Sequence, residues 1–118
     1  DYGYALYKTG HWEESNLILS KGADISCDPM FHNIMGRNFE AMGKYEDAEK
    51  EYLHSLNMVP CRLYPYILLM EMNVSIGNRN KALHYGNAAL KLPVNERNAN
   101  MKELHLRAQA CVDSLASR

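Results

Sequence analysis

The 118-residue chain has no surplus of charge of either sign. It carries 13 Lys and Arg against 14 Asp and Glu, which gives a net charge of −1, and it contains no Lys- or Arg-rich run. Surfaces that bind nucleic acid or anionic lipid depend on clustered basic residues. The composition therefore gives no electrostatic case for either partner.

Long apolar runs are also missing. The longest, Tyr66–Met70, is far too short to span a bilayer, and no signal-peptide pattern opens the chain. We expect that this domain is not itself inserted in a membrane. Because the chain starts Asp1-Tyr2-Gly3-Tyr4, already inside an expected helix, we favour a domain cut from a longer polypeptide over a trimmed mature protein.

Cysteine is scarce and badly spaced for a metal. The three cysteines form no CxxC pair, so the paired spacing of a zinc site is absent. A disulfide between Cys27 and Cys61 is compatible with the sequence, since both fall at junctions between repeats. Small buried or half-buried thiols are the commoner explanation, and they weakly favour a reducing compartment.

Catalytic motifs are absent as well. The sequence has no GxSxG, P-loop or Rossmann glycine pattern, and the one His/carboxylate pair at useful helical spacing is Glu51 with His54. We interpret the five histidines as polar surface residues and the acidic cluster of residues 46–51 as a solvated helix face. We predict no catalytic residue, no metal and no cofactor. The five histidines are His11, His32, His54, His84 and His105.

The chain does contain an internal repeat. It reads YKTGHWEES around Gly10, EAMGKYEDA around Gly43 and VSIGNRNKA around Gly77, so the glycines are 33 and 34 residues apart. A period of about 34 residues built from helix–turn–helix units resembles the tetratricopeptide repeat (TPR). The unit 29–62 matches the TPR pattern best; the first unit is truncated and the third departs from it, with Met70 for a small residue and Arg79 for an aromatic. The matching residues are Gly36, Phe39, Gly43, Tyr45, Ala48, Tyr52 and Pro60.

Apolar stripes with a helical period fill the segments between these glycines. We predict an all-α fold, a single TPR solenoid domain over 1–118 with a C-terminal capping helix. The repeats are about 1–28, 29–62 and 63–93, and the capping helix about 98–116. Expected helices are 1–9, 12–22, 29–42, 45–58, 63–76 and 79–92. The helix 63–76 is apolar all round. Asp28-Pro29 and Asn78 are expected N-terminal caps, and Asn100 with Glu103 an approximate capping box.

The capping helix carries the one apolar stripe that follows the third repeat, formed by Met101, Leu104, Ala108, Cys111 and Leu115. No glycine–aromatic–small turn comes after it. We expect a lone helix that covers the open end of the repeat stack.

The inner groove of the stack is the predicted functional surface. In TPR stacks the first helix of each pair lines the concave side, where aromatic, cationic and acidic groups suit an extended peptide or helix. The basic clamp of the chaperone-tail binders is absent, because Ile67 and Glu71 stand where cationic or amide groups would be needed. An alternative is that Tyr64, Ile67 and Leu68 only pack against neighbouring helices. The predicted groove residues are Tyr4, Tyr7, Lys8, Met30, Asn33, Arg37, Glu40, Tyr64, Ile67, Leu68 and Glu71.

Three segments resemble a narrower family. YGYALYKTGHWEES with DPMFHNIMGRNFEAMGKYEDAEKEY, NMVPCRLYPYILLMEM and KLPVNERNANMKEL together look like the C-terminal TPR tail of bacterial O-antigen ligase/polymerase-like membrane proteins. Such parents are glycosyltransferases of cell-envelope polysaccharide assembly, with catalytic residues in membrane loops that this chain does not contain.

The resemblance implies a non-catalytic protein–protein interaction module that is a soluble domain of a bacterial inner-membrane protein. This domain would lie on either the cytoplasmic or the periplasmic side of the membrane. The alternative is a free-standing soluble TPR adaptor or co-chaperone-like scaffold. Both hypotheses imply a protein or peptide partner.

Overall fold

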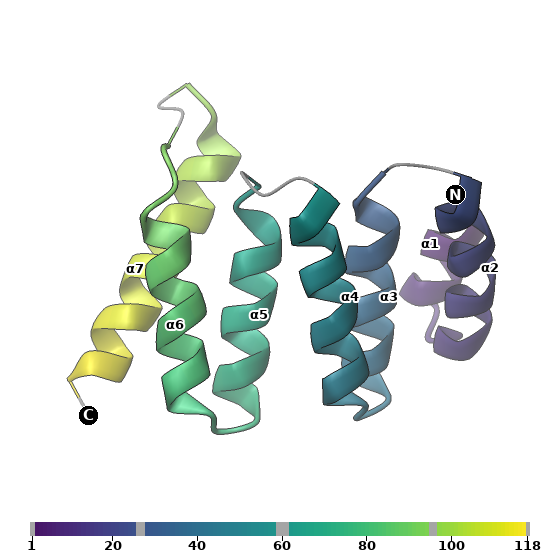
Figure 1. Cartoon of the computed structure of the whole chain (residues 1–118), viewed down its shortest axis with the longest axis horizontal. Helices are drawn as coiled ribbons and strands as arrows, with labels where there is room; N and C mark the ends of the chain where they lie inside the picture. Colours follow the sequence, from purple (N-terminus) through teal and green to yellow (C-terminus); the bar gives the residue numbers. More distant parts are fainter. Residues whose placement is uncertain (1, 26–27, 59–61, 95–96, 118) are drawn as a thin grey trace. The chain divides into compact units, whose positions relative to one another are not determined.

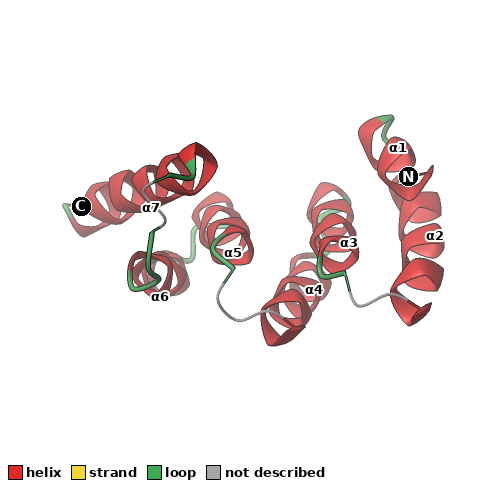
Figure 2. Ribbon diagram, turned by 90° about the horizontal axis from the view of Figure 1, so that it is seen from above, coloured by secondary structure: helices red, strands yellow, loops and turns green. Residues whose placement is uncertain are grey.

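The computed structural model describes residues 2–25, 28–58, 62–94 and 97–117. Within these ranges all regular structure is α-helical and no strand occurs, which confirms the all-α prediction (Figures 1 and 2). None of the described helices is long and apolar enough to cross a bilayer. The helices are α1 (Tyr2–Lys8), α2 (Trp12–Ile25), α3 (Met30–Ala41), α4 (Tyr45–Met58), α5 (Tyr64–Ser75), α6 (Arg79–Leu90) and α7 (Ala99–Ala116).

The three repeat glycines make the same turn. Gly10, Gly43 and Gly77 have φ angles of 83°, 76° and 80°, a left-handed conformation that costs glycine little. After each glycine the next amide donates to a carbonyl five residues back, as in Lys44 N to Phe39 O at 2.8 Å. This is the Schellman ending of a helix, so the 34-residue period is a period of turns.

The chain divides into two compact units, residues 1–60 and 61–118. In the first unit α1 packs on α2, α2 on α3 and α3 on α4. Leu19, Ile34 and Met35 form a buried cluster there. A polar chain crosses the same helices, because Asn38 Nδ2 donates to Ser15 Oγ at 2.8 Å and Ser15 Oγ donates to Gly3 O at 2.7 Å.

A close contact in the first unit joins α3 to α4. The fully buried ring of Tyr52 lies so near Gly36 that a Cβ added to this glycine would be 2.4 Å from Tyr52 Cε1. A small residue on the first helix of the pair thus receives a large one from the second.

In the second unit the same contact is reversed. Met70 stands seven residues before the turn glycine, as Gly36 does, and Gly86 stands nine residues after it, as Tyr52 does. A Cβ on Gly86 would be 3.1 Å from Met70 Sδ and 2.6 Å from Val112 Cγ2. The third repeat therefore keeps a small-against-large contact with the sizes exchanged, and the space at Gly86 also admits α7.

The second unit has its own core. Its buried cluster draws on α5, α6 and α7, and the stripe expected on the capping helix supplies Leu104 and Ala108; Leu115 is buried too. Figure 2 shows α7 beside α5 and α6. The cluster comprises Leu63, Ile67, Met70, Ala89, Leu104 and Ala108.

Arg79 explains one departure of the third repeat. Trp12 and Tyr45 occupy the equivalent position after the earlier turns. Here Arg79 donates from Nε and an Nη to the carbonyl oxygen of Leu115, at 2.9 and 2.8 Å. The last carbonyls of a helix have no partner within the helix. The arginine therefore fastens the end of α7 to the start of α6.

Several expected helix ends need correction. The helix α2 runs past Gly22 to Ile25, because this glycine faces Phe31 in ordinary contact and does not end the helix. The capping box at Asn100 is wrong, since the cap is Asn98, whose side chain accepts from Met101 N at 3.1 Å. The α4 bounds 45–58 are confirmed.

One predicted cap is confirmed, since Asn78 is the N-cap of α6 and accepts from Lys81 N at 3.1 Å. The cap at Asp28 is corrected: the N-cap of α3 is Pro29, and Asp28, one residue earlier, accepts from Met30 N at 2.9 Å. Cys27 and Cys61 lie outside the described residues, so the disulfide alternative is untested. Organisation as a single domain also stays a prediction.

Gly36→Ala should destabilise the protein. The added methyl cannot fit beside the Tyr52 ring, and overpacking of this kind costs about 1–3 kcal/mol, against about 1 kcal/mol gained in helix propensity. Urea unfolding followed by circular dichroism measures the loss. The matched control is Gly22→Ala, whose Cβ would be 3.4 Å from Phe31 and should be tolerated.

Leu104→Asp should remove the docking of α7. Leu104 is 7% exposed in the core of the second unit, so the variant loses the burial of a leucine and buries a carboxylate, a cost of at least about 3 kcal/mol. Leu106→Asp, at a side chain that is 67% exposed, should change the free energy of unfolding by less than about 0.5 kcal/mol. Equal losses in the two variants would contradict the assigned faces of α7.

Candidate functional site

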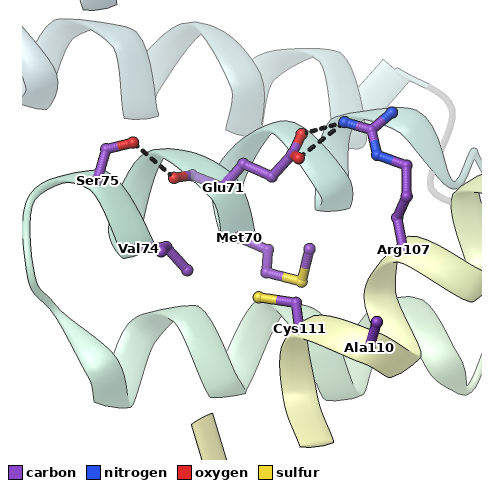
Figure 3. A pocket seen from close by; sticks show the side chains of 7 residues that line it. All are labelled: Met70, Glu71, Val74, Ser75, Arg107, Ala110 and Cys111. Atoms are coloured by element: carbon purple, nitrogen blue, oxygen red, sulfur yellow. Dashed lines mark hydrogen bonds and ion pairs between the residues drawn. The ribbon is translucent and has the colours of Figure 1, made fainter. Parts of the chain in front are cut away.

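The second unit contains a cleft of about 410 Å³ between α5 and α7 (Figure 3). Both helices pack mainly against α6 and meet each other along only a few residues, which leaves the opening between them. Residues from α5 form one wall and residues from α7 the other. The lining residues are Met70, Glu71, Val74, Ser75, Arg107, Ala110 and Cys111.

The floor of the cleft is apolar and is formed by polarizable sulfur-containing side chains. Met70 is buried at 1% exposure and Cys111 is a half-buried thiol, and their side chains point toward one another between the helices (Figure 3). Val74 is 41% exposed on the α5 wall. Methionine and cysteine side chains adapt their shape to a bound apolar group. Such a floor can accept an aliphatic side chain.

The rim of the cleft carries an ion pair. One nitrogen of Arg107, Nη2, donates to both carboxylate oxygens of Glu71, at 2.6 and 2.7 Å. The two side chains are 43% and 46% exposed. The hydrogen bond to Glu71 raises the pKa of Arg107, and the charges of Glu71 and Glu103 act in the same direction. The guanidinium stays charged at any physiological pH.

Four predicted groove residues come together in the first unit. The ammonium of Lys8 lies 5.6 Å from the ring centroid of Tyr4, and the Tyr4 and Tyr7 rings are 5.9 Å apart. The guanidinium of Arg37 lies 5.5 Å from the Tyr7 ring. We call Lys8, Tyr4, Tyr7 and Arg37 the cation–aromatic row. Met30 is 39% exposed.

Three predicted groove residues are buried. Asn33, Ile67 and Leu68 are 1%, 0% and 5% exposed, so their expected place on an accessible surface is corrected. Ile67 belongs to the core of the second unit. This agrees with the alternative that the residue packs against neighbouring helices and does not line a groove. The helical period predicts toward which face of the helix a side chain points. How far neighbouring helices cover that face decides the exposed fraction of the side chain.

The other predicted groove residues differ in their surroundings. Glu71 is exposed and lines the cleft. Tyr64 is half-buried against the core of the second unit, and Glu40 accepts from the Tyr52 hydroxyl at 2.9 Å. No partner is present, so binding by the accessible residues stays a prediction.

The α7 wall was missed by sequence reasoning, which gave this helix only a closing role. Cys111 belongs to the predicted stripe, and Arg107 and Ala110 precede it by four residues and one residue on the flank of that stripe. The cation of Arg107 beside the buried stripe was the one sequence signal for this wall. No residue near Arg107 in the sequence indicates that its ion-pair partner is Glu71.

One histidine prediction is also corrected. His32 is 8% exposed, stacks on His54 with ring centroids 3.9 Å apart, and places Nδ1 3.4 Å from Glu51 Oε2. It is not a surface residue, and Glu51 lies near it. Among the described residues no group of three or more His, Cys, Asp or Glu side chains could hold a metal ion.

No protein-family model matches the sequence, and no curated protein matches it. Solved structures do match. PcrH of Pseudomonas aeruginosa in complex with the chaperone-binding region of PopD has a TM-score of 0.85 at 19% identity, over 99% of this chain and 87% of that one. The fold is TPR-like.

A second chaperone gives the same result. The type III secretion translocator chaperone SycD of Yersinia enterocolitica has a TM-score of 0.83 at 20% identity, over 98% of this chain and 79% of that one. SycD in complex with a peptide of the translocator YopD reaches 0.85 at 20% identity, over 98% and 87%. Identities this low establish the fold alone.

Arg107→Ala should leave the free energy of unfolding within about 1 kcal/mol of the parent, because exposed ion pairs stabilise little. Arg79→Ala is the matched control. It removes two hydrogen bonds from a charged donor to the partly buried carbonyl of Leu115 and should cost about 1.5–3 kcal/mol. Thermal melts of the two variants measure the difference. A larger loss for Arg107→Ala would mean that the rim pair serves mainly to dock α7.

Proposed function

We propose that this chain is a non-catalytic module that binds an extended segment of a partner protein. The observation that carries the proposal is the cleft between α5 and α7, with its apolar floor and polar rim. Peptide-recognition grooves share this design, in which an anchor side chain fills a pocket and polar groups around it fix the chain direction.

The size of the cleft supports a side-chain anchor. A volume of about 410 Å³ falls within the range of small-molecule pockets and exceeds what one aliphatic side chain fills. Val74, Ala110 and Cys111 are accessible without moving a helix, because each is at least partly exposed. An extended chain can therefore lay one or two apolar side chains into the cleft while its backbone passes over the rim.

The solved neighbours support the same class of partner. PcrH and SycD are chaperones seen with segments of PopD and YopD. They favour the free-standing adaptor or co-chaperone-like scaffold over the tail of an O-antigen ligase-like protein, for which these comparisons give no support. A membrane-bound parent and either cellular location stay predictions from the sequence resemblance.

The first unit offers a second contact surface for a partner. In the cation–aromatic row, Tyr4 is 44% exposed and Lys8 is exposed, while Tyr7 is half-buried. Tyrosine and arginine are frequent anchors of protein interfaces because they bury large areas and still donate hydrogen bonds.

Ala110→Trp should abolish peptide binding. The indole would fill the cleft from an exposed position on α7, so the fold should be kept, and this can be checked by circular dichroism. A library of random dodecapeptides displayed on phage is selected on the parent and on the variant. The parent should enrich peptides that bind it in solution, and Ala110→Trp should bind these at least about 10-fold more weakly, since a filled pocket loses its anchor.

Ala99→Trp, at the exposed first residue of α7, is the matched control and should bind like the parent. A bound peptide should also slow alkylation of Cys111 by iodoacetamide, followed at that residue by mass spectrometry. No enrichment on the parent, or equal binding by the parent and Ala110→Trp, would reject the cleft as the binding site.

A further inference from the structure

The charges around the cleft are unequal. Its rim holds the Glu71 carboxylate and the Arg107 guanidinium, which largely offset each other. Glu103 lies one helical turn before Arg107 on α7, and its charge acts on Arg107 as well. Glu71 on α5 and Glu103 on α7 thus place two carboxylates near the one guanidinium of Arg107. A bound group near this rim meets a surplus of negative charge.

The rim pair also leaves Glu71 able to accept more hydrogen bonds. A carboxylate offers about four lone-pair sites. Within the described residues Arg107 uses one nitrogen for both oxygens, so each oxygen accepts one hydrogen bond from it. The Glu71 side chain is 46% exposed, so solvent reaches it. A second cation can therefore bind Glu71 without first removing Arg107.

We infer that the cleft selects a peptide segment in which an aliphatic side chain stands next to Lys or Arg. The aliphatic group packs on Met70, Val74 and Cys111, and the cationic group binds Glu71 and Glu103. This inference rests on the proposed function and names the sequence class that its site takes.

The opposite pairing is the main competitor. The Nε and Nη1 groups of Arg107 donate to no acceptor within the described residues, and an acidic side chain of a peptide would suit them. Such a carboxylate would also approach Glu71 and Glu103. With two like charges against one guanidinium, an acidic neighbour is disfavoured, whereas a peptide carbonyl can take these donors at no charge cost.

The test compares selected peptide pools. Random dodecapeptides on phage are selected on the parent, on Glu71→Gln, on Glu103→Gln and on Glu46→Gln. The last removes the same charge from the exposed start of α4, far along the chain from the cleft. Beside aliphatic residues, Lys and Arg should outnumber Asp and Glu in the parent and Glu46→Gln pools. This bias should fall in the two cleft pools.

Synthetic peptides then give the size of the effect. In one enriched peptide the basic residue is replaced by Gln and by Glu, and fluorescence anisotropy gives each Kd. The Gln peptide should bind the parent about 5-fold more weakly, the scale of an ion pair at a partly exposed site, and the Glu peptide weaker still. For Glu71→Gln combined with Glu103→Gln, the Lys-to-Gln difference should be under about 2-fold.

The outcomes separate the two proposals. Binding that Ala110→Trp abolishes, but without charge bias or with an acidic bias, overturns this inference and keeps the proposed function. A basic bias that persists in the double variant places the cation elsewhere and also overturns it. If no peptide is enriched on the parent, the proposed function itself fails.

Discussion

A helix of twelve to fourteen residues with an apolar stripe gains stability here only by burying that stripe against the helices beside it. The close approach this requires depends on a small residue meeting a large one at the middle of each pair. Gly36 and Tyr52 make that contact between α3 and α4, and Met70 and Gly86 make it between α5 and α6. These two contacts set how closely α3 approaches α4 and how closely α5 approaches α6.

The same constraint explains what the sequence predicts well. Turn glycines and apolar stripes are local signals, so the all-helical fold, the α4 bounds 45–58 and the Asn78 cap follow from neighbouring residues alone. Gly22 misled because a glycine that lies against Phe31 inside a helix has the same sequence signature as one that ends a helix. Conformation at a glycine depends on its tertiary contact, which sequence spacing does not contain.

The site is less predictable for a related reason. Glu71 was expected on the groove from its position in the repeat, yet its ion-pair partner is Arg107, 36 residues later. Ile67 was expected beside it and instead lies in the core at 0% exposure. The cleft arises because α5 and α7 both pack on α6 and only partly on each other. Such an opening depends on the third helix, and the sequence of one wall does not identify the residues that face it from the other.

The exchanged sizes at Met70 and Gly86 have an evolutionary consequence. Return to the arrangement of Gly36 and Tyr52 would require substitutions at both positions and more room at Val112, and each substitution alone is unfavourable. A glycine at 70 leaves a cavity beside Gly86, while a tyrosine at 86 overlaps Met70 and Val112. The two arrangements are separated by an unstable intermediate whichever residue changes first. The third repeat is therefore held in its divergent form, and the space at Gly86 that admits α7 is retained with it.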